Sequence, residues 1–155
     1  MEFLWLKWLH ILSATLLFGT GLGTAFYKWS VDRSGDVRAI AAVMPRVVLA
    51  DWLFTATTVV IQPLTGLRMA QLAGYPLTSG WVAWSLGLYV LAGLCWLPVV
   101  WLQLRMRDMA LRAAAEGAAL PPRYHRYARI WFVLGIPAFT ALMVVFYLMV
   151  FRPAG

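Results

Sequence analysis

Four long apolar segments constrain the fold of this chain more than any other feature. About 20 apolar residues in a helix cross the roughly 30 Å hydrocarbon core of a bilayer. Residues 3–27, 47–72, 81–104 and 130–151 each reach that length. Because these segments are continuous rather than alternating, they predict α-helices and not the strands of a transmembrane β-barrel. We therefore expect an all-α, polytopic membrane protein, a four-transmembrane-helix bundle that forms a single domain over residues 1–155.

The composition excludes a soluble domain and most catalytic classes. Hydrophobic residues make up 63% of the chain and charged residues only 12%, a balance that soluble globular domains do not show. The single cysteine, Cys95, allows neither an internal disulfide nor a thiolate metal cluster. The sequence pattern also contains no nucleophile with a base beside it, no paired carboxylates and no phosphate-binding loop.

The basic residues predict the orientation in the membrane. Residues 28–46 and 105–129, which we interpret as basic cytoplasmic loops, hold ten of the 13 lysines and arginines. We expect Pro45 to break the chain before the second span, and residues 105–116 to extend as a helix into water that ends at Gly117 and Pro121-Pro122. The opposite side carries only Lys7, Arg68 and Arg152. By the positive-inside rule, both termini lie on the non-cytoplasmic side of a bacterial inner (cytoplasmic) membrane. A basic belt beside anionic lipid headgroups accounts for the net charge of +7 without a nucleic-acid partner.

The first segment carries a lysine and a histidine, Lys7 and His10, one helical turn apart. Residues at i and i+3 share a helix face, and ionisable groups inside a membrane span face a bundle interior, a cavity or a ligand. At about 1.5 Å of rise per residue, His10 lies roughly 10 Å below the outer interface. Residues at a similar depth on the other segments are Gln62, Thr65, Met69, Tyr89, Met143 and Tyr147.

Two interpretations of His10 stay open. Imidazole is a common axial ligand of haem iron, and two cations nearer the outer water, Lys7 and Arg68, would pair with the propionates of a haem b. Met143, Tyr147 or water would take the other axial position, or that position would be empty. Alternatively, the His10 ring hydrogen-bonds a glutamine or threonine side chain of the second segment and only holds helices together.

Two further features concern packing. Asp51 is the only acid within a span, and we expect a structural ion pair with Arg46 or other basic residues of that face; a proton-handling role is the alternative. Gly19 and Gly23 form a GxxxG pair, which lets another helix approach closely. This spacing predicts close packing inside the bundle or in a homodimer. It also suits a non-catalytic structural or assembly subunit of a membrane complex.

The first and last segments resemble those of a known family. Trp5-Leu6-Lys7-Trp8-Leu9-His10-Ile11 is similar to the W-x-K-x-x-H-I opening of HemJ-type protoporphyrinogen oxidases, and Arg129, Pro137 and Arg152-Pro153 resemble the last helix of that family. The resemblance implies a haem b ligated through His10, with Lys7 as an essential neighbour. It also implies an oxidoreductase that oxidises protoporphyrinogen IX, or otherwise passes electrons, with a porphyrin or quinone as partner.

Nearly the whole chain resembles a family of predicted four-helix bacterial membrane proteins of uncharacterised function. The shared pattern is Lys7-x-x-His10, Gly19-x-Gly21, Asp51-Trp52, Gln62-Pro63-x-x-Gly66, Leu97-Pro98-x-x-Trp101 and Trp131 through Pro137. This second resemblance implies the four-helix fold and brings no activity with it.

Overall fold

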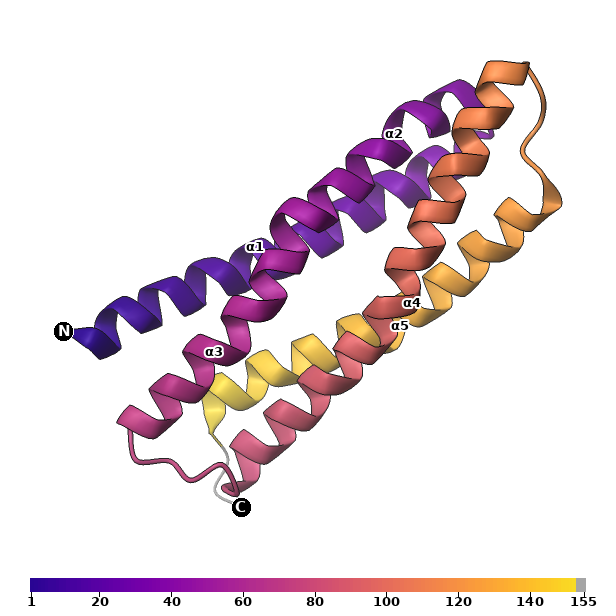
Figure 1. Cartoon of the computed structure of the whole chain (residues 1–155). Coiled ribbons are helices and arrows are strands. Elements are labelled where there is room, and N and C mark those ends of the chain that lie inside the picture. The colour runs from indigo at the N-terminus through magenta and orange to yellow at the C-terminus, as the bar shows by residue number, and fades with distance from the viewer. Residues whose placement is uncertain (153–155) are drawn as a thin grey trace.

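The computed structural model describes residues 1–152, and its regular elements within that range are all helices (Figure 1). They are α1 (Glu2–Ser34), α2 (Val37–Ala50), the π-helix η1 (Asp51–Thr55), α3 (Ala56–Leu72), α4 (Gly80–Glu116) and α5 (Pro122–Phe151). Because α2, η1 and α3 follow one another without a break, the described chain has four helices apolar and long enough to span a membrane. The expected all-α, four-helix membrane fold is confirmed. Pro153, part of the resemblance to HemJ, lies outside the described residues.

The helices extend well beyond the apolar segments. α4 has 37 residues, which makes it about 55 Å long at 1.5 Å per residue, against a hydrocarbon core of about 30 Å. Residues 28–46 are therefore mostly helical, and our interpretation of this stretch as a loop is wrong. The expected helical extension over residues 105–116 is confirmed, and residues 122–129 are helical as well, as the start of α5. Only residues 35–36 and 117–121 lie outside helices at this end of the bundle.

Local chemistry explains where these turns fall. Gly35 ends α1 with φ 68°, in the left-handed region that glycine adopts without steric cost. The Asp36 carboxylate then accepts hydrogen bonds from the backbone N–H groups two and three residues later, which caps the start of α2. Gly117 ends α4 in the left-handed region too, and Pro122 begins α5.

Pro45 lies inside α2, although we expected it to break the chain before the second span. Pro63, Pro98 and Pro137 likewise lie inside α3, α4 and α5. Each proline removes one backbone donor, but the helix continues on both sides, and packing against neighbouring helices makes the loss tolerable in membrane proteins. Proline is thus a poor marker of helix ends in this chain.

The long helices form two antiparallel pairs (Figure 1). One pair is α1 with the continuous helix made of α2, η1 and α3, and the other pair is α4 with α5. The pairs join where α2 packs against α4. Both ends of the described chain lie together at the end of the bundle away from the turns at 35–36 and 117–121. There Glu2 bonds Arg68 of α3, and the Arg152 guanidinium lies 5.8 Å from the Trp81 ring of α4. The termini therefore share one side of the membrane, and which side that is stays a prediction.

The hydrophobic core occupies the end opposite the termini. Its buried members are Ile40, Ala41, Met44, Val99, Leu102, Met106, Ala110, Tyr124 and Trp131. Towards the termini, α1 and α3 diverge from α4 and α5 (Figure 1), and two cavities lie between these helices. The bundle is thus closed at one end and loosely packed in its other half.

Gly19 and Gly23 do not pack against another helix within residues 1–152. A Cβ atom added at either position would meet no atom within 4 Å. The close approach that the GxxxG spacing predicts inside the bundle is therefore wrong, because α1 packs on α3 through a different face. A homodimer through this pair stays a prediction.

Candidate functional site

His10 lies buried on α1 and is held by the second long helix. Its Nδ1 atom is 2.7 Å from the Thr65 hydroxyl of α3, and that hydroxyl donates its own hydrogen to the Ile61 carbonyl at 2.7 Å. Since a hydroxyl has one hydrogen to give, it accepts from His10 Nδ1–H. The Nε2 atom is then the unprotonated nitrogen of the ring, and it has no hydrogen-bond partner among residues 1–152.

Two further contacts fix this part of α1 against α3. The Gln62 amide donates to the His10 carbonyl at 2.8 Å and to the Ser13 hydroxyl at 2.7 Å. A Cβ atom at Gly66 would lie 3.2 Å from His10 Cε1, so the ring packs closely onto this glycine and would have to shift slightly to accept a larger residue there. The expected hydrogen bond between the His10 ring and a glutamine or threonine side chain of the second segment is thus confirmed, and the threonine is Thr65.

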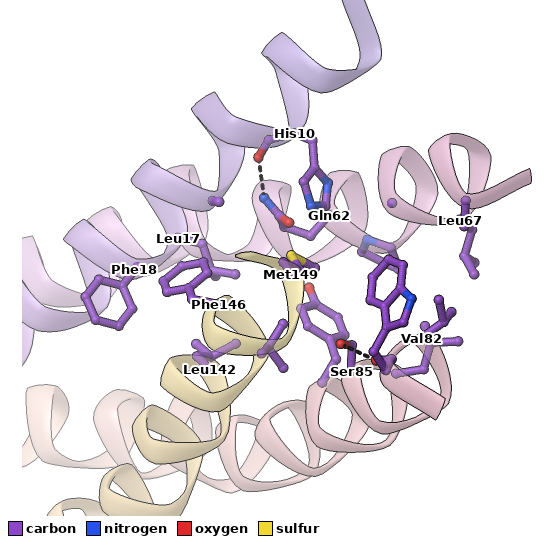
Figure 2. A pocket seen from close by; sticks show the side chains of 18 residues that line it. His10, Leu17, Phe18, Gln62, Leu67, Val82, Ser85, Leu142, Phe146 and Met149 are labelled. Carbon is purple, nitrogen blue, oxygen red and sulfur yellow. Dashed lines mark hydrogen bonds between the residues drawn. The ribbon is translucent and has the colours of Figure 1, made fainter. Parts of the chain in front are cut away.

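The His10 ring lines a cavity of about 80 Å³ that touches all four long helices. We term it the His10 cavity. Its other walls are almost entirely apolar and include Trp81, Leu142 and Phe146. Figure 2 shows Met149 of α5 facing the same cavity from the side opposite α1.

The other predicted site residues do not line the His10 cavity. Lys7 is exposed, and Arg68 bonds Glu2 at 2.7 Å on the exposed end of the bundle. Met143 and Tyr147 are 50% and 55% exposed on the outer face of α5. Both lie at about the same depth in the bundle as His10, but their side chains point outward and not toward the His10 cavity.

The His10 ring offers the donor atom that a haem b needs, but the His10 cavity is too small to hold a haem. A histidine whose Nδ1–H is held by a partner and whose Nε2 is free is the usual state of an axial or metal-binding imidazole. However, about 80 Å³ is well below the roughly 300–1,000 Å³ of typical small-molecule sites, and a macrocycle needs far more. Within residues 1–152, no group of three His, Cys, Asp or Glu side chains is placed to hold a metal ion.

A larger cavity of about 390 Å³ lies next to the His10 cavity and shares Leu17, Tyr89 and Leu142 with it. α1, η1, α3, α4 and α5 line this central cavity. Its polar side chains include Asp51 and Thr55 of η1. Sequence reasoning assigned no cavity here, because only the divergence of the helices creates it.

Asp51 forms no ion pair with any residue in the described part of the chain, so the expected pairing with Arg46 or another basic residue of that face is wrong. The Thr55 hydroxyl donates to the Asp51 carboxyl group at 3.1 Å, and Gln103 of α4 lies beside it. Arg46 precedes Asp51 by five residues, which turns it about 140° away around the helix. π-helical turns often occur at functional sites, and this one directs an acid into a cavity.

Two indole N–H groups of the central cavity also lack partners. The Nε1 atoms of Trp96 and Trp131 are buried and find no hydrogen-bond acceptor within residues 1–152, and both side chains line the cavity. A buried donor without an acceptor costs about 1–3 kcal/mol. An oxygen atom of a bound molecule would recover part of that cost.

An ion pair within α1 is tied to α5 by a tyrosine hydroxyl at the closed end of the bundle. Lys28, only 1% exposed, bonds Asp32 at 2.5 Å, and the Tyr124 hydroxyl donates to the other Asp32 oxygen at 2.6 Å. The Lys28 ammonium also lies 4.7 Å from the centre of the Trp131 ring. Burial, reinforced by the bond to Asp32, raises the pKa of the Tyr124 hydroxyl, so it remains a donor. The sequence indicates Lys28 only as one charge of the basic stretch 28–46 and gives no sign of its burial.

Comparison with known proteins identifies a family but no activity. The model of the family DUF2269, described as a predicted integral membrane protein, matches residues 4–153. No curated protein and no solved structure matches the chain. The findings agree with the resemblance to an uncharacterised membrane protein family and give no support to the resemblance to HemJ.

Proposed function

This chain belongs to the DUF2269 family of predicted integral membrane proteins, and we propose that it binds a lipophilic molecule of the quinone class in its central cavity. The volume and lining of that cavity carry the proposal. Small-molecule sites typically measure about 300–1,000 Å³ and are apolar with a few polar groups. The central cavity, at about 390 Å³, has apolar walls with Asp51, Thr55 and Gln103 on one side.

The polar side chains suit a flat molecule with oxygen acceptors. The amide of Gln103 and the unpartnered indole N–H groups of Trp96 and Trp131 are donors. A quinone carries two carbonyl oxygens that accept from such donors, and its ring packs favourably against aromatic side chains. A purely aliphatic molecule would leave these donors unsatisfied.

The cavity also has a route to the lipid. Leu22 of α1 and Phe132 and Ile136 of α5 line the cavity and are exposed on the outside of the bundle. α1 and α5 meet closely only at a few points, such as the stacked rings of Phe18 and Phe139. A ring inside the cavity with its isoprenoid tail between α1 and α5 would match a lipophile that enters from the bilayer.

A cavity-filling variant tests the proposal. Gly93 lines the central cavity, whereas Gly87 of the same helix lines neither cavity, and an added Cβ would meet nothing within 4 Å at either position. We expect quinone to co-purify with the wild type and with Gly87→Leu, and to be lost from Gly93→Leu, as measured by mass spectrometry of organic extracts. Titration with decylubiquinone should show at least about tenfold weaker binding in Gly93→Leu, a difference of about 1.4 kcal/mol. Equal quinone content in all three proteins would refute the proposal.

Haem b binding, with electron transfer or oxidation of protoporphyrinogen IX, is a second candidate. The free Nε2 of His10 favours it, and the small volume of the His10 cavity opposes it. When bound, a haem would supply one-electron chemistry. Its test is the oxidised and reduced visible spectrum of the wild type, His10→Ala and His125→Ala, each expressed with ample haem. A haem spectrum lost only from His10→Ala would support it, and a colourless wild type would exclude it.

The same preparations test the non-catalytic alternative, a structural or assembly subunit. The exposed position of Gly19 leaves a small-residue surface for another chain. A wild type without quinone or haem that co-purifies in fixed proportion with another membrane protein would favour this role.

A further inference from the structure

A pocket of about 310 Å³ lies between α4 and α5 at the closed end of the bundle, near the connection 117–121. Three arginines line it, together with one acid and two aromatic residues. They are Arg105, Arg112, Arg123, Asp108, Trp101 and Tyr127, and Met109 completes the lining. We term it the arginine pocket. It is separate from both cavities described above and shares no lining residue with them.

The helix register brings these side chains together. Arg105, Asp108 and Arg112 follow one another at i, i+3 and i+7, which is one face of α4. Arg123 and Tyr127 lie at i and i+4 on α5, and α5 runs back along α4 after a short connection. Two helix faces therefore present their charges to a single space.

The pocket carries uncompensated positive charge. None of its three arginines forms an ion pair with an acid within residues 1–152, while its one acid, Asp108, is bonded by Arg107 at 2.8 Å. The Arg105 guanidinium lies 5.5 Å from the Trp101 ring centre, and the Trp101 and Tyr127 rings are 5.6 Å apart. The guanidinium groups of the pocket thus lie beside two neighbouring aromatic rings.

We propose that the arginine pocket binds the phosphate group of an anionic phospholipid. Guanidinium groups bind phosphate through paired charge-assisted hydrogen bonds. Arg105 directly follows the apolar segment 81–104, and tryptophan and tyrosine favour the depth of the lipid headgroups. Basic pockets between membrane helices bind acidic headgroups in this way. A soluble phosphate compound offers the same anion, and the experiment separates the two sources.

The test compares two triple variants with the same change in charge. One is Arg105→Gln, Arg112→Gln and Arg123→Gln; the control is Arg38→Gln, Arg46→Gln and Arg126→Gln, three exposed arginines outside the pocket. Native mass spectrometry with phosphatidylglycerol should show binding to the control and at least about tenfold weaker binding to the pocket variant. Phosphatidylcholine serves as the zwitterionic comparison, and inorganic phosphate and glycerol 3-phosphate are added as soluble competitors.

A second variant does not depend on removing arginines. Asp108→Asn removes the one negative charge from the pocket, so phosphatidylglycerol should bind more tightly to it than to the wild type. Equal losses in the two triple variants would show diffuse surface attraction and overturn the proposal. So would displacement of the lipid by millimolar glycerol 3-phosphate, because a free phosphate compound would then be the ligand. Unchanged or weaker lipid binding in Asp108→Asn would also contradict it.

Discussion

The Thr65 hydroxyl decides which nitrogen of His10 carries the proton. Thr65→Val keeps the shape of the side chain but removes the acceptor for Nδ1–H. We expect the ring to lose its preference for the Nδ1–H tautomer, with a loss of about 1 kcal/mol in the free energy of unfolding, since a buried hydrogen bond contributes about that much. Nitrogen NMR of labelled histidine reports the tautomer, and thermal unfolding in detergent reports the stability.

Thr57→Val is the matched control, because the Thr57 hydroxyl bonds only backbone carbonyls of its own helix and is exposed. It should leave the His10 tautomer unchanged. If Thr65→Val left the nitrogen spectrum of His10 unaltered, the assignment of the free Nε2 atom would be wrong.

The sequence predicted the depth of these residues but not their direction. Counting residues placed Gln62 and Thr65 level with His10, and both contacts exist. The same counting selected Met143 and Tyr147, although Met149 lines the cavity. Six residues separate Met143 from Met149, a rotation of about 240° at 100° per residue. With apolar residues on every face of α5, no stripe in the sequence shows which face turns inward.

The bond from Tyr124 of α5 to Asp32 of α1 ties two helices that otherwise touch little. Asp32→Asn would leave the Lys28 ammonium buried without a counter-charge. Removing one partner of a buried ion pair costs about 3–5 kcal/mol, so we expect a large fall in the melting temperature. Asp108→Asn, which breaks a half-exposed pair with Arg107 at the surface of the bundle, should change stability by less than about 1 kcal/mol. A melting temperature equal in the two variants would show that the Lys28 pair does not hold the closed end.

The π-helical turn η1 holds one residue more per hydrogen-bonded turn than an α-helix. Deleting the exposed Leu53 should therefore convert η1 to α-helix and leave α2 and α3 in their present register. Deleting the exposed Val60 from regular α3 should instead turn Gln62 and Thr65 by about 100° away from His10. Thermal unfolding should show the Val60 deletion to be much the less stable. The opposite order would mean that η1 does not absorb an extra residue.

Helix ends were only partly predictable from the sequence. The turn at Gly117 was expected where it occurs, because glycine followed by two prolines stops a helix. The turn at Gly35 was missed, since the charged residues around it were interpreted as a loop, although charged side chains are common on a helix that extends into water. The π-turn carries no sequence signal that we identified, because Asp51–Thr55 has an ordinary helical composition.

At the scale of the whole molecule, apolar segments of membrane-spanning length were sufficient to predict four long helices and termini on one side. They did not predict that packing is tight at one end and loose at the other. That asymmetry arises because α2 packs on α4 near the closed end, whereas α3 has little contact with α4. Long-range contacts of this kind determine the central cavity and leave no periodic trace in the sequence.

The predicted orientation of the bundle in the membrane rests on its charge asymmetry, and cysteine labelling tests it. Arginines concentrate at the end that holds Ser34, while the end that holds Thr78 is nearly free of them. Because lysine and arginine are retained on the cytoplasmic side, a membrane-impermeant maleimide added to spheroplasts should label Thr78→Cys. It should label Ser34→Cys only after the membrane is permeabilised, with both substitutions made in a Cys95→Ser background. Both positions are exposed in the structure, so unequal labelling reports the membrane barrier. Labelling of Ser34→Cys in intact spheroplasts would reverse the topology and place the arginine pocket in the outer leaflet.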